Sequence, residues 1–475
     1  MKLFARHRLI TVMILMASAI RVVAMLATRS AKLFHSDSYE YLNLAVRLVP
    51  SPGFRPSGYP FLLALLRPFH SLQVVVGVQH VLGLVTGLLI YALLRRRSLP
   101  TWGAALAAAP VLFDVQFLWR EHNILAETQF IFLIVAAVAV LLWSPQLTWR
   151  AAAVAGALLA FATITRTVAM PLLALVVFYL LVRRVPWRTV ATLSVAGLLP
   201  LLAYASWYDH HNGEFSLSGA DGIALWARTM TFADCKVIKP SADEARLCPQ
   251  GERFELASEY VWATYSPLYF PGGLSDSTNN QTARSFAVHA ITAQPLDYLN
   301  AVTQETLLAF TWFPYTPSGW HSSTDLFPEA TENPLTGQPL VDRVRREYAT
   351  DAGELRPVEP YTGYLSSYQR VMVLPGPLLA LLLLVGSWGL LRRRPGTGLM
   401  LAFALVLFVV PVATLGFDHR YVLPVIPIAC LAAALALARP QPTQPLEAVE
   451  SPHHRVAELE YLSCQAALVP ESPIR

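Results

Sequence analysis

The sequence predicts an all-α polytopic membrane protein with about ten transmembrane helices, surface-lying helices in a first outer loop and a larger mixed extracytoplasmic loop region. Hydrophobic side chains make up 55 % of the 475 residues and charged ones 14 %, and the mean hydropathy is +0.45. This composition is too apolar for an ordinary soluble protein. Apolar segments long enough to cross a bilayer recur along the chain, and arginines follow every second one.

The predicted spans are apolar segments of roughly 15 to 24 residues, where about 20 residues cross a bilayer. In order they are 9–28, 72–94, 100–118, 125–143, 151–165, 168–182, 189–208, 370–391, 397–415 and 421–438. The first is longer than the core of a signal peptide and has no small-residue cleavage site before Arg29. We therefore expect it to remain a span.

Arginine placement predicts the topology, because short cytoplasmic loops carry an excess of Lys and Arg. The arginines in question are Arg6 and Arg8, Arg95 to Arg97, Arg150, Arg183, Arg184 and Arg188, Arg392 to Arg394, and Arg439. All of them fall on one side if both termini are cytoplasmic. We expect a multi-pass protein of the cytoplasmic membrane whose two long outer segments, and any active site they hold, are extracytoplasmic.

Four parts are predicted along the chain. Residues 1–208 form a transmembrane core of seven spans that includes the first outer loop, 29–71. Residues 209–369 form the larger extracytoplasmic region, and 370–439 form three C-terminal spans. The proline-rich tail, 440–475, is expected to be a disordered cytoplasmic end. The net charge of +5 comes mostly from the arginines of the predicted cytoplasmic loops. The sequence has no aromatic-rich basic face, so nucleic acid is not an expected partner.

Asp37 follows the first predicted span and opens a segment, 38–49, whose apolar residues share one face of a helix. Such a helix is expected to lie along the membrane surface. Asp37 has two interpretations. It caps this helix, with Glu40 as the capping-box partner, or it is a general base whose pKa is tuned by partial desolvation.

Glu127 lies at the edge of the fourth predicted span. Placing a carboxylate in a membrane costs about 2.5 to 3.5 kcal/mol at the bilayer centre and less near the edge. The expected partner is Arg166, at the tip of the short helical pair 151–165 and 168–182. The pair is either structural or leaves Arg166 free to grip a phosphate, for which a guanidinium is well shaped.

Arg55, in a proline-rich turn, and Arg420, at the start of the last span, are further cations on the predicted outer face. Together with Arg166 they would suit an anionic head group. Inside the apolar segments, three polar residues are expected to be buried and partnered structural groups. These residues are Arg21, His80 and Asp114.

Cys235 and Cys248 lie together in the larger outer region and would form a disulfide in an oxidising compartment. The histidines of the outer segments lack the helical spacing of a metal site, so no metal is predicted and no cofactor is required.

The order of several short motifs resembles the GT-C superfamily of membrane glycosyltransferases. The motifs are Asp37 with Tyr39 and Tyr41, the turn Arg55-Pro56-Ser57-Gly58-Tyr59-Pro60, Leu125-Ala126-Glu127-Thr128, Thr165-Arg166, and Arg420-Tyr421-Val422-Leu423-Pro424. The nearest resemblance is to the bacterial enzymes that use polyprenyl-phosphate sugars, similar to the protein O-mannosyltransferase and aminoarabinose transferase families. It covers the first seven spans and the last one, and matches 209–369 only loosely.

The resemblance implies transfer of a sugar from a polyprenyl-phosphate donor to a glycan, lipid or protein acceptor at the outer face of the membrane. Asp37 matches the catalytic base, and either Glu121 or Glu127 matches a second acid. The implied donor-phosphate contacts are Arg55, Arg166, His419, Arg420 and Tyr421, and the further site candidates are Tyr39, Glu40, Tyr59 and His122.

Two departures from the family pattern narrow this expectation. Asp37 stands alone between Ser36 and Ser38, whereas O-mannosyltransferases typically carry paired acids at this place. This difference weakens the expectation that the reaction is protein mannosylation. A large soluble C-terminal domain is not evident, which argues against an oligosaccharyltransferase. The main alternative is a transporter or flippase of a lipid-linked sugar, because charged intramembrane residues also mark substrate pathways. A non-catalytic membrane scaffold is a third interpretation.

Overall fold

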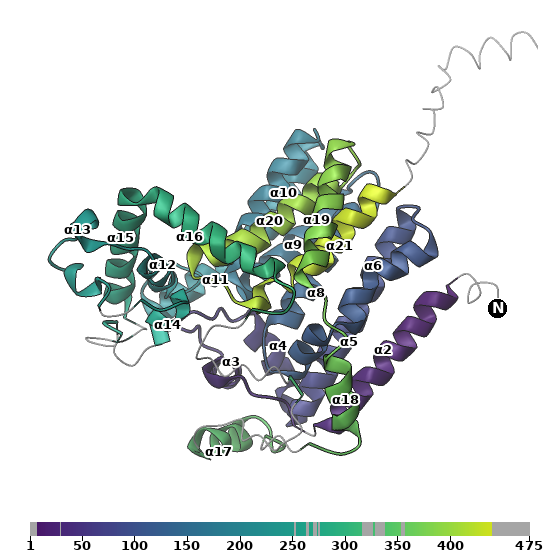
Figure 1. The fold of residues 1–475 in the computed structure, drawn as a ribbon, viewed down its shortest axis with the longest axis horizontal. Helices are drawn as coiled ribbons and strands as arrows, with labels where there is room; N and C mark the ends of the chain where they lie inside the picture. Colours follow the sequence, from purple (N-terminus) through teal and green to yellow (C-terminus); the bar gives the residue numbers. More distant parts are fainter. Residues whose placement is uncertain are drawn as a thin grey trace, which may run out of the picture. The chain divides into compact units, whose positions relative to one another are not determined.

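A computed structural model describes residues 7–28, 30–250, 253–262, 266–268, 273, 276–315, 326–327, 338–352 and 357–438. These residues belong to one compact unit that ends at Ala438. Within them the chain is helical, with two isolated bridges and no strand (Figure 1). The all-α prediction is confirmed. The expected tail, 440–475, lies outside the described residues, and the division of the rest into three parts stays a prediction.

The helices follow one another with short connections. The first group is α2 (Arg8–Ala27), α3 (His35–Arg47), α4 (Gly58–Leu66), η1 (Arg67–Phe69), α5 (Leu72–Arg96), α6 (Thr101–Phe113), α7 (Val115–His122) and α8 (Glu127–Leu142). Next come α9 (Trp149–Thr165), η2 (Thr167–Ala169), α10 (Met170–Val182), α11 (Trp187–Asn212), α12 (Asp221–Met230), α13 (Cys235–Ile238), η3 (Ala245–Leu247), α14 (Ala257–Trp262) and α15 (Ser277–Ala293). The last group is α16 (Pro295–Leu307), η4 (Leu308–Phe310), α17 (Gln338–Glu347), α18 (Tyr361–Gln369), α19 (Gly376–Leu391), α20 (Thr397–Thr414), η5 (His419–Tyr421) and α21 (Val425–Leu437).

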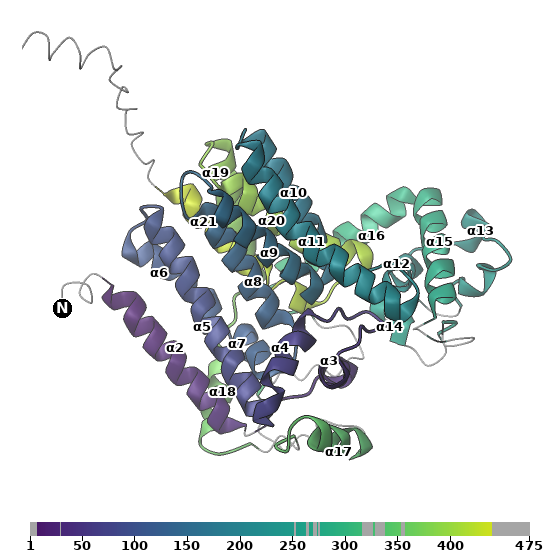
Figure 2. The same ribbon diagram turned by 180° about the vertical axis from the view of Figure 1, so that it is seen from behind.

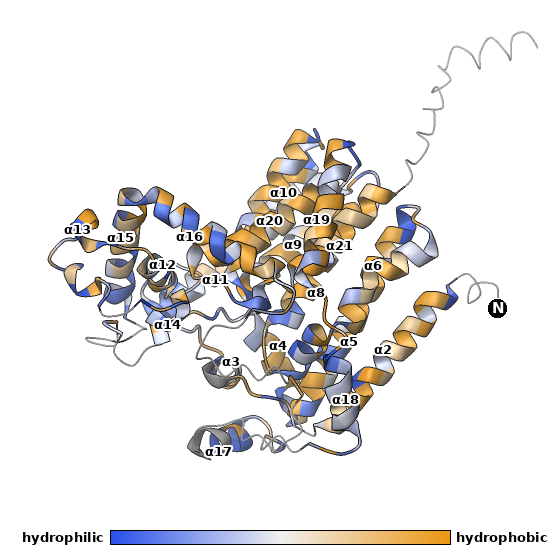
Figure 3. Cartoon of the chain, viewed as in Figure 1, coloured by the Kyte–Doolittle hydropathy of each residue, from blue (hydrophilic) through white to orange (hydrophobic). Residues whose placement is uncertain are grey.

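Every predicted span coincides with helix, but ten spans are not confirmed. In the part of the chain that the structure describes, five helical segments are long and apolar enough to cross a membrane, or six if α6 and α7, which meet at a bend of 48°, are one span. The other apolar helices have 10–17 residues, shorter than a typical span. They are α8, α9, the η2–α10 segment and α19, and Figure 3 shows that they consist largely of hydrophobic residues.

The centre of the helical bundle is α21. All its residues from Val425 to Ala436 are buried, because it packs against α19, α20 and α6 (Figure 2). A helix that is apolar on all sides belongs in a protein core or in a membrane, and here neighbouring helices cover it. The packing of α21 therefore fixes the position of the η5 turn that precedes it.

A buried ion pair joins α2 to α7. The Arg21 guanidinium donates from Nε and Nη2 to the two carboxylate oxygens of Glu121, both at 2.8 Å, and His80 Nδ1 on α5 lies 2.8 Å from Glu121 Oε2. Gly83 makes room for this group, because a Cβ there would lie 1.8 Å from Glu121 Oε1. The prediction that Arg21 and His80 are buried, partnered groups is confirmed. So is that for Asp114, which accepts from the backbone N–H of Gln116 and Leu374.

Helix α4 approaches the end of α9 very closely at Gly58. A Cβ on Gly58 would lie 2.5 Å from the carbonyl oxygen of Ile164, so only glycine fits. The Gln129 amide on α8 secures this contact by donating to Gly58 O at 3.1 Å and to Thr165 Oγ1 at 3.0 Å. As a result, the turn that carries Arg55 lies beside the α9–η2 connection that carries Arg166.

Helix α17 is anchored on the first loop region. Tyr348, which follows the helix, donates to Leu63 O at 2.7 Å, and the Asp351 carboxylate accepts from Ser71 Oγ at 2.6 Å and Leu72 N at 2.8 Å. Side chains of α3, α4 and the 344–352 segment share one hydrophobic cluster. Part of the predicted region 209–369 thus lies directly against α3.

We predict that Glu121→Gln lowers the free energy of unfolding by about 3–5 kcal/mol, because Arg21 is left buried without its counter-charge. Thermal unfolding of the purified protein in detergent measures this change. The matched control is Asp221→Asn, which breaks an ion pair with Arg284 whose side chains are 52 % and 44 % exposed. Such surface pairs contribute about 0–1 kcal/mol. Equal melting temperatures for the two variants would contradict the structural role of Glu121.

Candidate functional site

Asp37 lies in the first turn of α3 and does not cap it. The helix N-cap is Phe34, which has no side-chain cap, and its backbone N–H donates to Ser38 Oγ at 2.7 Å. The Ser38 hydroxyl in turn donates to Ile124 O at 2.8 Å, so this serine ties α3 to the loop before α8. The helix-cap interpretation of Asp37 is therefore wrong, because Ser38 takes the local hydrogen bond and leaves the Asp37 carboxylate free for other partners.

Two arginines hold the Asp37 carboxylate, one at each oxygen. Arg55 Nη2 donates to Oδ1, and Arg420 Nη1 donates to Oδ2 at 3.0 Å. The Asp37 side chain is 15 % exposed. Burial by itself would raise its pKa, but Arg420 and Arg55 together hold the pKa below the ordinary value.

The lowered pKa has a consequence for stability. Because the pKa of Asp37 is lower in the folded than in the unfolded protein, its ion pairs stabilise the fold at pH values above about 4. This contribution is lost as the pH falls through the folded-state pKa. At neutral pH the carboxylate is fully ionised.

Glu40, one helical turn after Asp37, binds the same guanidinium. Its Oε2 accepts from Arg55 Nη1 and its Oε1 from the Ser51 hydroxyl. Arg55 is 9 % exposed, so this nearly buried cation is shared between two acids of one helix face.

Glu127 begins α8 and meets the predicted partner. Arg166 Nη1 donates to Glu127 Oε1 at 2.8 Å, and Arg420 Nη1 lies 3.8 Å from the same oxygen. The Tyr421 ring has both cations close to it, at 5.0 Å from Arg166 and 5.2 Å from Arg420. Arg420 therefore connects the Asp37 and Glu127 carboxylates.

Asp418 completes the group, although the sequence did not mark it as a site residue. Its carboxylate accepts from Arg420 N at 3.0 Å and lies 2.8 Å from Arg420 Nε. Burial by itself would raise the pKa of Asp418, but Arg420 and Arg120 hold it below the ordinary value. We call the whole set the Asp37 cluster, which consists of Asp37, Glu40, Arg55, Glu127, Arg166, Asp418 and Arg420.

Arg120 is a second residue that was missed. It shares the Phe34 ring with Arg420, at 5.9 and 5.8 Å respectively, and its Nε and Nη1 have no hydrogen-bond partner among the described residues. The only sequence signal for Arg120 and Asp418 was their position next to Glu121 and Arg420.

Three other candidates have their polar contacts outside the Asp37 cluster. Glu121 is held in the ion pair with Arg21. His122 Nε2 lies 2.5 Å from Thr28 Oγ1, and the buried Tyr59 hydroxyl donates to Gln79 at 2.7 Å. His419, beside Arg420, has an Nδ1 that is buried without a partner among the described residues.

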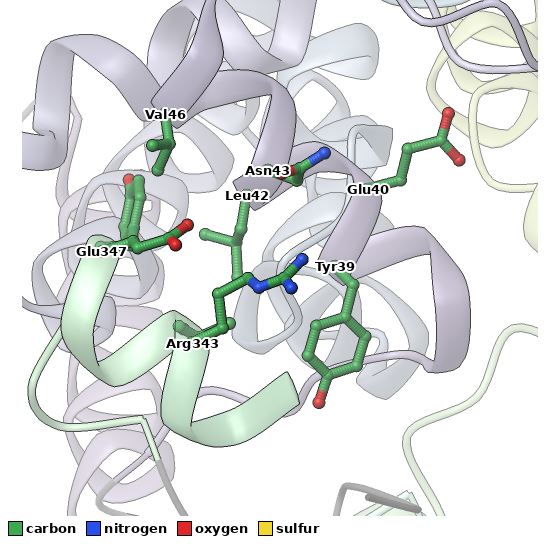
Figure 4. A pocket seen from close by; sticks show the side chains of 9 residues that line it. Tyr39, Glu40, Leu42, Asn43, Val46, Arg343 and Glu347 are labelled. Atoms are coloured by element: carbon green, nitrogen blue, oxygen red, sulfur yellow. The ribbon is translucent and has the colours of Figure 1, made fainter. Parts of the chain in front are cut away.

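A cavity of about 360 Å³ lies between α3 and α17 (Figure 4). Its lining is Tyr39, Glu40, Leu42, Asn43, Val46, Arg343, Val344, Glu347 and Tyr348. Figure 4 shows Arg343 and Glu347 reaching toward α3, whereas the Glu40 carboxylate points away from them. Tyr39 Oη and Asn43 Oδ1 are buried without a partner among the described residues. Burial raises the pKa of Tyr39 to about 12, so its hydroxyl stays a neutral donor.

In the larger loop region, Cys235 and Cys248 are joined by a disulfide. Among the described residues, no three His, Cys, Asp or Glu side chains are grouped so that they could hold a metal ion.

Chemically, the Asp37 cluster combines carboxylates with guanidiniums from separate segments. Planar guanidiniums bind phosphate through paired hydrogen bonds, and a buried carboxylate accepts a proton well once its cationic partners withdraw. The arrangement is suited to a reaction in which an anionic group departs while a hydroxyl or amine loses a proton.

No protein-family model matches the sequence, and no curated protein matches it. Among solved structures, the chain is similar to the Pmt1–Pmt2 protein O-mannosyltransferase complex of S. cerevisiae bound to its sugar donor, with 16 % identity and a TM-score of 0.35 over 47 % of this chain and 36 % of that one. It is similar to the oligosaccharyltransferase of Archaeoglobus fulgidus, with 12 % identity and a TM-score of 0.44 over 99 % of this chain and 53 % of that one.

A third similar structure is ArnT from Cupriavidus metallidurans bound to undecaprenyl phosphate, with 13 % identity and a TM-score of 0.35 over 89 % of this chain and 76 % of that one. The chain therefore spans 36 % and 53 % of the lengths of the first two structures. The O-mannosyltransferase and ArnT are proteins of the kinds named by the sequence resemblance, and similarity at these TM-scores carries no argument about the activity of this chain.

Proposed function

We propose that this protein is a glycosyltransferase that moves a sugar from a polyprenyl-phosphate donor to an acceptor at the outer face of the cytoplasmic membrane. One observation carries the proposal: Asp37 and Glu127 lie among three guanidiniums, contributed by separate segments, in a chain of apolar helices. The topology that goes with it is ten spans with both termini cytoplasmic, as the arginine placement predicts.

The proposed reaction needs one base and several cations. An acceptor hydroxyl or amine gives its proton to Asp37 as it attacks the anomeric carbon. The bond between that carbon and the phosphate oxygen breaks, and the phosphate leaves with the electron pair. Arg166 and Arg420 would stabilise the charge on the departing phosphate. A direct displacement of this kind inverts the anomeric centre.

The two arginines on Asp37 imply that the donor binds before Asp37 becomes an effective base. A carboxylate with a depressed pKa is a weak base, so Asp37 is poorly active while both arginines hold it. A phosphate would compete for Arg420 and draw the guanidinium from the carboxylate. Burial would then raise the pKa of Asp37, and the base would become stronger when the donor is bound.

Between the two candidates for a second acid, we assign Glu127. It holds Arg166 and lies 3.8 Å from Arg420, and so positions the cations that would contact the phosphate. Glu121 is assigned to the structural ion pair with Arg21.

For the acceptor, we propose the cavity between α3 and α17. Tyr39 Oη and Asn43 Oδ1 offer a buried donor and a buried acceptor, which a hydroxyl-bearing ligand would satisfy. Glu40 belongs both to the cavity lining and to the Asp37 cluster, so the proposed acceptor cavity and the base share helix α3.

Asp37→Asn is expected to lower the turnover rate by about 10²- to 10⁴-fold, the usual contribution of a general base. The measurement is transfer of radiolabelled sugar from a panel of polyprenyl-phosphate monosaccharides by purified protein in nanodiscs. Asp221→Asn removes an equivalent carboxylate from a surface ion pair and should leave the rate unchanged. Intact transfer by Asp37→Asn would eliminate Asp37 as the base, and lipid translocation without transfer would favour a transporter.

Undecaprenyl phosphate is expected to draw Arg420 away from Asp37. An opposite charge near a carboxylate lowers its pKa by about 1–3 units, so the loss of Arg420 should raise the pH at which Asp37 becomes protonated by about one unit or more. Protonation is followed by the labelling of Asp37 with a water-soluble carbodiimide, measured by mass spectrometry. Undecaprenol, which lacks the phosphate, is the control lipid. The same profile with both lipids would contradict competition for Arg420.

Asn43→Leu removes the buried amide but keeps the number and branching of the side-chain heavy atoms, and it is expected to raise the KM for the acceptor about 10-fold, with little change in the KM for the donor. Initial rates at varied acceptor and donor concentrations separate the two constants. Asn300→Leu, at a position on α16, is the matched control. A change in the donor KM alone would place the donor in this cavity instead.

A further inference from the structure

The turn at Phe417 and Asp418 leads into η5, which contains Arg420. This turn is held from outside the helical bundle. The Glu305 carboxylate on α16 accepts from the backbone N–H of Phe417 at 2.9 Å. Phe417 is 4 % exposed, so the hydrogen bond that its N–H donates to the Glu305 carboxylate is well shielded from water. Tyr298, also on α16, donates to Ala413 O at 2.9 Å, just before the same turn.

Glu305 is itself held by a buried cation. Arg228 Nη1 on α12 lies 2.6 Å from Glu305 Oε1, and the two side chains are 0 % and 12 % exposed. The other end of the guanidinium donates to Thr231 Oγ1 at 2.7 Å. A buried arginine is stable only with a counter-charge, so Glu305 has a fixed position between α12 and the turn.

These contacts form a continuous connection from α12 to the base. It passes from Arg228 to Glu305, and from Glu305 to the backbone of Phe417. Asp418 follows Phe417 in the chain, and its Oδ2 lies 2.8 Å from Arg420 Nε. Arg420 then donates to Asp37 at 3.0 Å. Helix α12 packs on α14 and α15, and these helices form a separate hydrophobic cluster.

We propose that Glu305 is a positioning residue of the site: with Arg228 it fixes the turn at Phe417, keeps Arg420 paired with Asp37, and so couples the α12–α15 helices to the base. Glu305 acts on Asp37 through Arg420. The inference rests on the proposed function only for its catalytic meaning, since the coupling itself exists without substrate.

Loosening the turn should change the protonation of Asp37 in a known direction. With Arg420 drawn away, burial dominates and the pKa of Asp37 rises. Several other ionisable groups surround this path and remain in place in the variants below. Around Asp37 they are Arg55, Glu40, Glu127, Arg166, Asp418, Arg120, Tyr41 and Tyr421, and around Glu305 they are Glu255, Glu259 and Tyr315.

The test is the pH profile of carbodiimide labelling of Asp37 in the full-length protein in nanodiscs, without substrate. The double variant Arg228→Met and Glu305→Leu removes both buried charges, so no unpaired charge is left. We expect its labelling midpoint to rise by about one pH unit. Labelling of the exposed Asp243 in the same sample corrects for the pH dependence of the reagent, and the control variant Arg284→Gln should show no shift of the Asp37 midpoint.

Three further variants make the result decisive. Arg420→Gln should shift the midpoint at least as far, and adding the double change to it should produce no additional shift, because Glu305 acts through Arg420. If the double variant does not fold, Glu305→Gln, which keeps the side-chain shape, should give a smaller shift in the same direction. A folded variant without a shift, or additive shifts, would overturn the proposal. Since labelling needs no donor or acceptor, this outcome is independent of whether transfer is observed.

Discussion

The Asp37 carboxylate and its two guanidiniums form the interaction on which the rest of the site depends. A carboxylate that is 15 % exposed would be neutral at a higher pH without cations beside it, and Arg55 and Arg420 would repel each other without the carboxylate between them. The balance requires three segments to meet: α3, the turn before α4 and the η5 turn before α21. Hydrophobic packing places all three segments, and the ion pair of Glu305 with Arg228 also holds the η5 turn.

That packing uses small residues and apolar helices. Gly58 lets α4 touch the end of α9, and Gly83 leaves space for the buried Glu121 carboxylate. Helix α21, surrounded on all sides, holds η5 at its start. The α16 contact at Phe417 adds a second constraint on the same turn. Thus the rigidity comes from the hydrophobic bundle, while the acidity of Asp37 is set by a few polar contacts at its end.

Local patterns in the sequence predicted the apolar helices, the partnered Arg21, His80 and Asp114, and the pairing of Glu127 with Arg166. These features depend on hydropathy and on the rule that an acid at a membrane edge needs a partner. The partners of Asp37 could not be assigned in the same way, because they lie 18 and 383 residues away. The expected helix cap failed because Ser38 makes the local hydrogen bond. The cavity was not predictable either, since α17 is placed beside α3 by tertiary contacts, among them those of Tyr348 with Leu63 and of Asp351 with Leu72.

The most direct test of the account is a cryo-electron microscopy map of the protein in nanodiscs with undecaprenyl phosphate. The account predicts density for the phosphate within hydrogen-bond distance of Arg166 and Arg420, with Arg420 moved away from Asp37 and the carboxylate left facing the cavity side of α3. A phosphate bound elsewhere, with the Arg420–Asp37 ion pair unchanged, would contradict the central claim that the Asp37 cluster is where the lipid-linked donor reacts.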